Sequence, residues 1–378
     1  MARILYFDPR KLGGHRLEYL HHYYEAALQD KNNDYVIITG YNFYDLNKDY
    51  NWPDAPNITI ELADKDYMDE PSSSLFLMSL KRSFYLRKLI KKYSIDKVFL
   101  VNMINNMPFL PFFVYRKVVV KGIIYSIPFY KKEQRFIRKI RNHVIYYLFA
   151  KCRIFDKIYL LNSNDAVDYY NKKYSVDKFK FLPDPFACND KQVDISIRNK
   201  YNIPDDNIIF TQFGYLSINK GTCNILKCFS ELPDNIKSKV TLILAGQIEL
   251  SSKKQIIEFE QNAIDSGVML CREEGFVSFD LIYALCRSSN FLLMPYLDTS
   301  KSSGMFGYSS YFNIPLIAPD SGLIGEIVKR YDLGYCLKDI STEGLKSFIQ
   351  DNLYDKRKVS DDYIQSHSLK KFESEIIG

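Results

Sequence analysis

The sequence of 378 residues has little tryptophan and little glycine, with one Trp and 16 Gly. None of its seven cysteines forms a Cys-x-x-Cys pair, and none of its five histidines lies at a metal-ligand spacing from them. An odd number of scattered cysteines favours free thiols in a reducing compartment over a disulfide framework. The same scatter argues against a structural zinc site.

No apolar run is long enough to cross a bilayer. The most apolar segment, residues 107–130, is interrupted by Arg116, Lys117 and Lys121, whereas a spanning helix needs about 20 consecutive apolar residues. The apolar stretch at the N-terminus is too short for the hydrophobic region of a signal peptide. We therefore expect a cytoplasmic protein without a spanning anchor.

Two common catalytic and cofactor motifs are also missing. No Gly-x-Gly-x-x-Gly follows the first predicted strand, which argues against dinucleotide binding. No Gly-x-Ser-x-Gly is present, which argues against a Ser-His-Asp hydrolase. We expect no prosthetic group.

Basic residues are concentrated in the first half. Residues 1–186 hold 30 Lys and Arg against 20 Asp and Glu, and residues 81–180 hold 23 against 6. The basic centres are residues 81–92 and 131–141, and the helix predicted over the second also carries an apolar stripe, Phe136, Ile140, Val144 and Leu148. The stripe either faces the core or docks on an anionic membrane. We expect no nucleic-acid binding, since no binding motif accompanies the charge.

Short β-branched or aromatic runs alternate with helical patterns along the chain. The pattern predicts strands near residues 3–8, 35–40, 58–62, 98–102, 118–127 and 157–162, and again near 208–214, 240–246, 268–271, 291–296, 315–320 and 335–337. Such alternation predicts parallel sheets covered on both faces. The proline-containing segment 182–204 reads as a linker. We expect two Rossmann-like α/β domains, 1–186 and 187–360, and a C-terminal helix, 361–378, packing towards the first.

Open parallel sheets bind ligands at the carboxyl ends of their strands. We therefore expect the functional site between the two halves. In the second half, a strand is followed by a turn from Gly214 through Lys220 to Gly221, and a later strand by Ser302, Ser303 and Gly304. Both turns lead into predicted helices, whose N-termini attract anions such as phosphate. At the Lys220-Gly221 helix start we expect an ammonium and free amides together. The alternative for Lys220 is a solvent-exposed side chain beside a helix-start glycine.

These turns, together with segments 274–278, 313–318 and 321–328, resemble the donor half of retaining glycosyltransferase family 4, which has the GT-B fold. The resemblance covers most of residues 207–337, and more weakly the first half, where Gly13-Gly14-His15-Arg16 follows the first strand. Three positions differ from the family pattern. Tyr215 stands where the family usually has Arg, and Ser300 and Tyr308 stand at the two carboxylate positions of its Glu-x7-Glu motif.

The resemblance implies a hexosyltransferase-type glycosyltransferase of cell-surface polysaccharide biosynthesis. It would retain the anomeric configuration and transfer a sugar from a nucleotide diphosphate sugar, most simply a UDP-sugar and otherwise a GDP-sugar, to a glycan or lipid-linked acceptor. We expect metal-independent catalysis, and we read Asp64-Lys65-Asp66 as a solvated turn. The enzyme would be cytoplasmic, or peripheral on the inner membrane face. The alternatives are a GT-B protein that binds a glycan or partner without turnover, and a nucleotide-sugar 2-epimerase.

The expected site residues divide by role. His15 is either a catalytic contact to the diphosphate or sugar, or a residue capping its own helix. Asp298 is the carboxylate nearest to the position of Ser300, so it is the second catalytic candidate. The expected donor contacts are Gly14, Gly214, Lys220, Gly221, Phe276, Val277, Ser302, Ser303, Gly304 and Tyr308.

Overall fold

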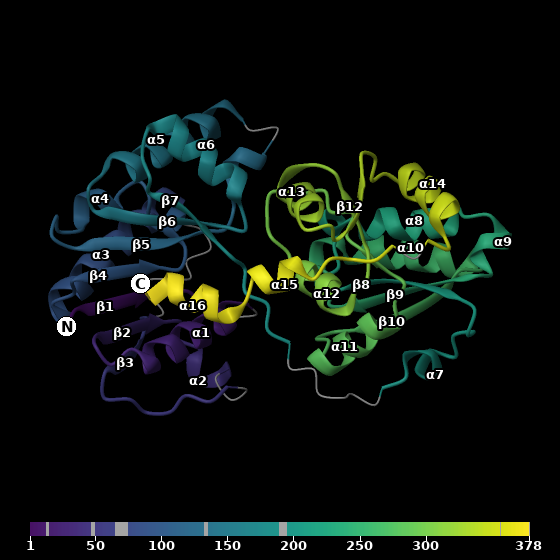
Figure 1. Ribbon diagram of the computed structural model, residues 1–378, viewed down its shortest axis with the longest axis horizontal. Helices are drawn as coiled ribbons and strands as arrows, with labels where there is room; N and C mark the ends of the chain where they lie inside the picture. The colour runs from purple at the N-terminus through teal and green to yellow at the C-terminus, as the bar shows by residue number, and fades with distance from the viewer. Residues whose placement is uncertain are drawn as a thin grey trace. The chain divides into compact units, whose positions relative to one another are not determined.

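The computed structural model describes residues 1–12, 15–46, 50–64, 75–131, 135–188, 195–355 and 357–377. The chain divides into two compact units (Figure 1). The first unit comprises Met1–Pro185 and Ser368–Gly378, and the second comprises Phe186–His367.

The first unit is built on a seven-stranded parallel sheet of order β3-β2-β1-β4-β5-β6-β7. Its strands are β1 (Arg3–Phe7), β2 (Asp34–Thr39), β3 (Ile58–Leu62), β4 (Lys97–Leu100), β5 (Val119–Ile124), β6 (Phe155–Leu161) and β7 (Phe179–Leu182). Its helices are α1 (His15–Gln29), α2 (Phe43–Leu46), α3 (Leu75–Tyr93), η3 (Met103–Asn106), α4 (Leu110–Phe113), η4 (Pro128–Tyr130), α5 (Phe136–Lys151), α6 (Asn164–Tyr174) and α16 (Leu369–Ile377).

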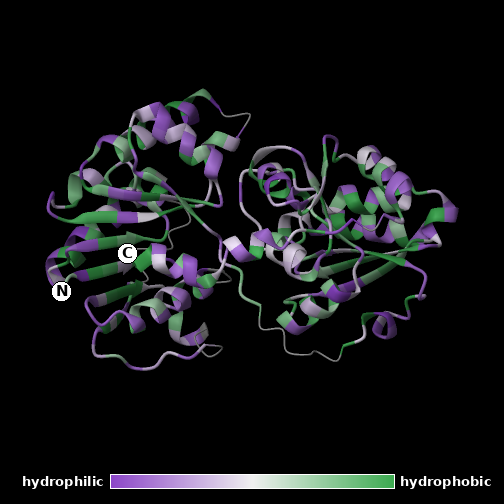
Figure 2. Cartoon of the chain, in the orientation of Figure 1, coloured by the Kyte–Doolittle hydropathy of each residue, from purple (hydrophilic) through white to green (hydrophobic). Residues whose placement is uncertain are grey.

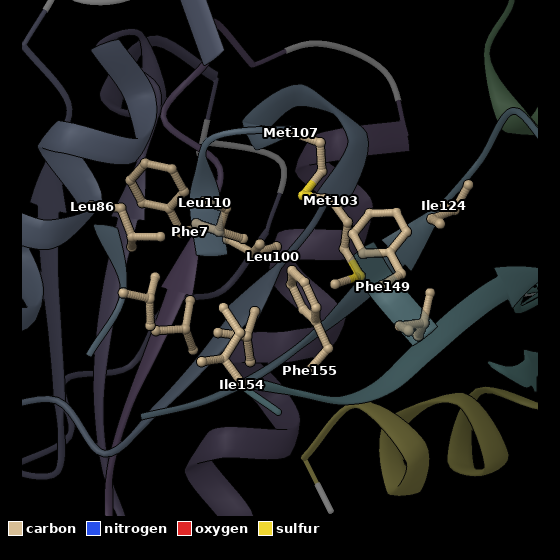
Figure 3. Packing of buried hydrophobic residues seen from close by; sticks show 14 of the residues in the cluster. Phe7, Leu86, Leu100, Met103, Met107, Leu110, Ile124, Phe149, Ile154 and Phe155 are labelled. Carbon is tan, nitrogen blue, oxygen red and sulfur yellow. The ribbon is translucent and has the colours of Figure 1, made fainter. Parts of the chain in front are cut away.

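Both faces of this sheet are buried, as a parallel sheet requires. Along β1, Leu5 and Phe7 join one core with α3, α5 and α6, while Ile4 and Tyr6 join the opposite core with α1 and α16. Figure 3 shows the first of these cores, in which the rings of Phe149 and Phe155 lie 5.1 Å apart. The C-terminal helix therefore closes one face of the first unit, and the Tyr159 hydroxyl donates to the Glu375 carbonyl at 2.6 Å.

The second unit is built on a six-stranded parallel sheet of order β10-β9-β8-β11-β12-β13. Its strands are β8 (Ile208–Phe213), β9 (Val240–Gly246), β10 (Met269–Glu274), β11 (Phe291–Leu293), β12 (Leu316–Pro319) and β13 (Gly334–Leu337). Its helices are α7 (Ile197–Tyr201), η5 (Ile218–Lys220), α8 (Thr222–Ser230), α9 (Asp234–Lys237), η6 (Leu250–Ser252), α10 (Lys253–Asp265), α11 (Phe279–Ser288), α12 (Met305–Phe312), α13 (Gly322–Arg330), α14 (Thr342–Asn352) and α15 (Asp362–Ser366).

Apolar side chains of α8, α10 and α14 pack on one face of this sheet. Figure 2 shows the same pattern in both units: the strands are mostly hydrophobic, whereas the surface helices carry hydrophobic and hydrophilic residues together. Two Rossmann-like α/β units with parallel sheets confirm the fold class that the sequence predicts.

Four elements differ in detail from the sequence prediction. Strand β7, which pairs with β6, is missing from the predicted strands. Strand β11 ends at Leu293 rather than near 296, since Pro295 has no N–H to donate to a ladder. Helix α5 begins at Phe136, not at 131. The expected single C-terminal helix is two helices, α15 and α16, separated at His367 and Ser368.

Candidate functional site

The carboxyl edge of the six-stranded sheet carries a series of tight loops. Because all six strands are parallel, the loops after β8, β9, β10, β11 and β12 leave from the same edge. Five glycines with positive φ lie in or beside these loops, namely Gly214, Gly221, Gly246, Gly275 and Gly322. Positive φ is readily available only to glycine. The backbone at this edge thus depends on residues without a side chain.

The backbone around the Gly214–Gly221 turn is packed closely. A Cβ at Gly246 would lie 1.6 Å from the Gly214 carbonyl oxygen, and one at Gly221 would lie 2.2 Å from the Pro295 carbonyl oxygen. No side chain fits at either distance, so these two glycines fix the turn after β8 against the loops after β9 and β11. The turn is therefore a rigid feature of the edge.

Lys220 lies at the end of this turn, with its ammonium directed to an aromatic ring. The Lys220 amide donates to the Ser217 carbonyl at 3.1 Å, and the Gly221 amide donates to the Ile218 carbonyl at 2.9 Å. Our expectation that these amides are free for an anion is therefore wrong. The Lys220 Nζ lies 3.7 Å from the centre of the Tyr296 ring. What Lys220 can present to an anion is its ammonium group.

The loop after β11 is held by its own side chains and by α13. Asp298 Oδ1 accepts hydrogen bonds from the Ser300 amide at 3.1 Å and the Ser300 hydroxyl at 2.6 Å. Asp298 Oδ2 lies 3.4 Å from Lys301 Nζ. The Thr299 carbonyl accepts from the Leu323 amide at 2.8 Å, so it occupies the N-terminus of α13. Ser300, at the first carboxylate position of the family motif, is buried, and Asp298 places a carboxylate beside it.

The N-terminus of α12 differs from that of α13. The Ser303 hydroxyl accepts from the Met305 amide at 3.4 Å and lies 3.4 Å from the Tyr296 hydroxyl. Among the residues that the structure describes, the Ser303 and Gly304 amides have no hydrogen-bond acceptor. Gly304 is exposed, with φ −59° and ψ −19°. A Cβ there would meet no atom of the described residues within 4 Å. This helix start can therefore receive an anion.

Two further groups of expected donor contacts lie on neighbouring elements. Phe276, in the loop between β10 and α11, is 91% exposed, whereas Val277 beside it is buried. The half-buried Tyr308 packs its ring at 5.0 Å from Phe186 and 5.2 Å from Phe213. An exposed aromatic ring and a half-buried phenol are suited to contacting a base and a sugar hydroxyl.

The carboxyl edge of the seven-stranded sheet collects polar residues that the sequence analysis did not single out. Asp8 follows β1 and makes a bidentate ion pair with Arg10, at 2.6 and 3.0 Å. Asp184 follows β7 and accepts from the Tyr19 hydroxyl at 2.5 Å. Burial, and then Asp184, raises the pKa of Tyr19 well above its usual value. Asp8 ends the strand predicted near residues 3–8, whereas no strand was predicted before Asp184, so strand prediction could mark only Asp8.

Arg16 lies near this edge, and the hydrogen-bonding capacity of its guanidinium group is only partly used. Its Nη1 atom is buried and has no hydrogen-bond partner among the described residues. Burial, and then Arg10, lowers the pKa of Arg16. His15 is the first residue of α1, and Gly14 lies outside the described residues. Arg16 is thus the described residue beside the expected Gly-Gly loop that could meet an anionic acceptor.

The described residues contain neither a metal-binding cluster nor a membrane-spanning helix. Within the described ranges, no group of three or more His, Cys, Asp or Glu side chains could hold a metal ion. Of the Asp64-Lys65-Asp66 segment, only Asp64 belongs to those ranges. No helix in the described part of the chain is long and apolar enough to cross a membrane.

The two Rossmann-like units with parallel sheets place the chain in the GT-B fold class. No protein-family model matches the sequence, and neither does any curated protein. The structure of HepE from Anabaena in complex with UDP and glucose is similar over 100% of this chain and 98% of its own, with a TM-score of 0.69 and 14% identity.

Two other glycosyl-group enzymes of this fold are similar over comparable lengths. WaaG, a glycosyltransferase involved in lipopolysaccharide biosynthesis, matches 99% of this chain and 95% of its own, with a TM-score of 0.64 and 13% identity. Sucrose-phosphate synthase from Thermosynechococcus elongatus matches 100% of this chain and 94% of its own, with a TM-score of 0.66 and 13% identity. Identities this low establish the fold alone.

Proposed function

We propose that this protein is a glycosyltransferase whose second unit binds a UDP-sugar. The observation that carries the proposal is the start of α12, where the Ser303 and Gly304 amides lack an acceptor among the described residues and a Cβ at Gly304 would meet no atom within 4 Å. A helix N-terminus with unpaired amides favours a diphosphate. The fold supports the proposal, and HepE, of the same fold, has been solved with UDP and with UDP-glucose.

In this proposal each expected donor residue has a stated task. The ammonium of Lys220 and the Ser302–Gly304 turn hold the diphosphate and stabilise the charge that develops on it as the sugar leaves. Gly214 and Gly221 shape the turn that positions Lys220. Phe276 and Val277 contact the base, and Tyr308 contacts the ribose. Because an ammonium and a helix N-terminus supply the charge stabilisation, the proposed mechanism does not require a metal.

The reacting sugar is assigned to Asp298 and His15. Ser300 holds one oxygen of the Asp298 carboxylate through two hydrogen bonds. The other oxygen lies beside Lys301, and we assign to it a hydrogen bond from a sugar hydroxyl. His15, at the start of α1 in the first unit, is proposed to contact the diphosphate or sugar. Retention of configuration belongs to the same proposal and rests on the family resemblance.

Replacing Asp298 with alanine is expected to lower turnover more than nucleotide affinity, because a sugar-hydroxyl contact contributes to the transition state and not to UDP binding. Steady-state kcat and KM, together with UDP affinity by calorimetry, would separate the two effects. Lys301→Ala is the matched control, since it removes the partner of the carboxylate and keeps Asp298. A UDP affinity that falls as far as kcat in the Asp298 variant would contradict the assignment.

Replacing Lys220 with alanine is expected to weaken UDP binding by about 1.5–3 kcal/mol, the cost of losing a charge-assisted hydrogen bond. Lys227→Ala, on the exposed side of α8, serves as the control. Calorimetric titration with UDP and with uridine would localise the effect, because only UDP carries the diphosphate. Equal affinities for UDP in wild type and in a folded Lys220→Ala protein would exclude contact with the diphosphate.

The proposed nucleotide specificity can be tested with a thermal-shift panel of UDP, GDP, TDP, CMP and ADP. Ligand present at about 100 times its dissociation constant stabilises the folded state by about 2.7 kcal/mol. UDP is expected to give the largest shift. A GDP shift larger than that of UDP would reassign the base, and a panel without any shift would favour the second candidate function below.

The acceptor is proposed to be a glycan or a lipid-diphosphate-linked glycan that binds the first unit, in cell-surface polysaccharide synthesis. The start of α5 supports a membrane location, because Phe136 and Ile137 are 76% and 80% exposed. Exposed basic side chains lie among these apolar ones, namely Arg135, Arg138, Lys139 and Arg141. An exposed helix face of apolar and basic residues suits the surface of an anionic leaflet. The enzyme would be peripheral on the cytoplasmic face.

A second candidate function is binding of a glycan or partner without turnover. The observation that favours it is the loss of both motif carboxylates, at Ser300 and Tyr308. Release of UDP from a UDP-sugar, supplied together with a lipid-linked acceptor, distinguishes the two functions. The glycosyltransferase proposal expects turnover that Asp298→Ala reduces. The binding proposal expects a nucleotide-independent interaction with glycan and no turnover.

A further inference from the structure

A basic pocket lies at the amino edge of the seven-stranded sheet, where β4, β5, β6 and β7 begin. It has a volume of about 490 Å³ and is lined by Lys97, Val119, Lys121, Arg153, Phe155, Asp156 and Lys178. Asp8 and Asp184 follow the opposite ends of strands in this sheet. The pocket therefore uses none of the residues assigned to donor or acceptor binding above.

The sheet register explains why the lysines converge. Lys97 and Phe99 are two residues apart on β4 and so point to the same face. Lys121 on β5 is paired directly with Phe99, which puts the Lys121 side chain on that face as well. Lys178 stands immediately before β7, and its Nζ donates to the Cys152 carbonyl at 2.8 Å. Strand pairing thus fixes Lys97 and Lys121, and the bond to Cys152 holds the Lys178 side chain.

The charges lining the pocket are not balanced. Four cations, Lys97, Lys121, Arg153 and Lys178, share one carboxylate. That carboxylate, Asp156, lies 3.5 Å from Lys121 Nζ, and its side chain is 51% exposed, whereas that of Lys121 is 12% exposed. The ammonium of Lys121 is therefore nearly buried, whereas the carboxylate that it faces is half exposed to solvent.

The titration behaviour of Lys121 and Lys178 agrees with this imbalance. Burial, and then Lys157, lowers the pKa of Lys121, with a smaller contribution from Lys97 in the same direction and an opposing one from Asp156. Burial also lowers the pKa of Lys178. An anion placed among these groups would relieve the repulsion and favour their charged forms.

We propose that this pocket binds a small phosphate-bearing ligand with at least two negative charges. Lysine ammonium groups are compact charges that suit phosphate oxygens, and the half-buried Val119 in the lining gives an organic group an apolar contact. The phosphate can come from a soluble metabolite or from a lipid headgroup. The site is additional to the donor site, so the proposal does not depend on glycosyl transfer.

The test is site-resolved acylation of lysines in the full-length protein with a water-soluble acetylating reagent, read out by peptide mass spectrometry. Saturating pyrophosphate is expected to slow acylation of Lys97, Lys121 and Lys178 about tenfold, the size of one charge-assisted contact. Lys117, exposed in the turn before β5, is the internal control and should react at an unchanged rate. Because each lysine is read separately, pyrophosphate bound in the second unit would not affect the result.

Two further arms of this experiment distinguish a soluble phosphate ligand from a lipid headgroup. Protection of the lysines by pyrophosphate indicates a soluble ligand. Protection by phosphatidic acid vesicles alone, and not by phosphatidylcholine vesicles, indicates a lipid headgroup. Either result supports the site. In Arg153→Gln, which changes an exposed residue, protection of the remaining lysines should require about tenfold more pyrophosphate. Unchanged acylation of all three lysines in every arm, in wild-type protein, would overturn the proposal.

Discussion

Replacing Gly304 with valine is expected to abolish binding of UDP and UDP-sugars while leaving the protein folded. The backbone at Gly304 has helical angles that any residue adopts, and an added Cβ meets no atom of the described part of the chain within 4 Å. The fold therefore gives no reason for glycine at this position. If a phosphate approaches the Ser303 and Gly304 amides, the isopropyl group occupies its place. Calorimetry with UDP, and circular dichroism with thermal melting, would measure the two parts of this prediction.

The matched control is Glu343→Val, which places the same side chain in the exposed first turn of α14, a helix of the same unit. It should bind UDP as wild type does. Wild-type UDP affinity in Gly304→Val would show that the start of α12 does not receive the diphosphate. Unfolding of Gly304→Val would conflict with the open space at that residue.

Reversing three charges at the start of α5, in Arg135→Glu, Arg138→Glu and Lys139→Glu together, is expected to remove most binding to anionic vesicles. Each basic residue near an anionic leaflet contributes about 1 kcal/mol. The loss of three contributions alone lowers the partition coefficient by about two orders of magnitude, and the new carboxylates add repulsion. Co-sedimentation with phosphatidylglycerol vesicles at low and high salt measures the effect.

A control with the same charge change in the second unit is Lys239→Glu, Lys253→Glu and Lys254→Glu, all at exposed positions. It should keep vesicle binding. A separate variant, Phe136→Ser with Ile137→Ser, removes the apolar part and should weaken binding at high salt, where screening leaves the hydrophobic contribution. Wild-type protein that ignores anionic vesicles even at low salt would remove the membrane proposal.

Much of the fold could be predicted because its strands are buried on both faces. Segments such as Val240–Gly246 read as continuous apolar runs, and every residue of that strand is buried. The missed strand β7 is short, with the sequence Phe-Lys-Phe-Leu before Pro183, and only its pairing with β6 identifies it. Whether such a short segment forms a strand depends on its tertiary pairing and not on its local sequence pattern.

The division of the C-terminal segment also depends on tertiary contacts. His367 is buried and its ring stacks on Tyr363, with the ring centres 3.8 Å apart. Phe372 and Ile376 of α16 are buried in the core that contains α1. A polar helical pattern over residues 361–377 does not reveal that its two halves pack into different units.

The order of strands and glycines was enough to predict that the donor site lies at a sheet edge. The hydrogen bonds within that site could not be predicted from the sequence. Sequence reasoning assigned free amides to Lys220 and Gly221, whereas η5 uses both. It also did not anticipate that Ser300 would bind Asp298. Which amide stays unpaired depends on the tightness of each turn, and that is set by contacts such as the one between Gly221 and Pro295.

The central claim is that the carboxyl edge of the six-stranded sheet binds the UDP-sugar, and amide hydrogen exchange with and without UDP tests it most directly. Unpaired amides exchange quickly and slow down when they bond to phosphate. We expect UDP to protect segments 275–278 and 300–308, with the largest change at Ser303 and Gly304. UDP binding without protection of 300–308, or with protection confined to the first unit, would contradict the account.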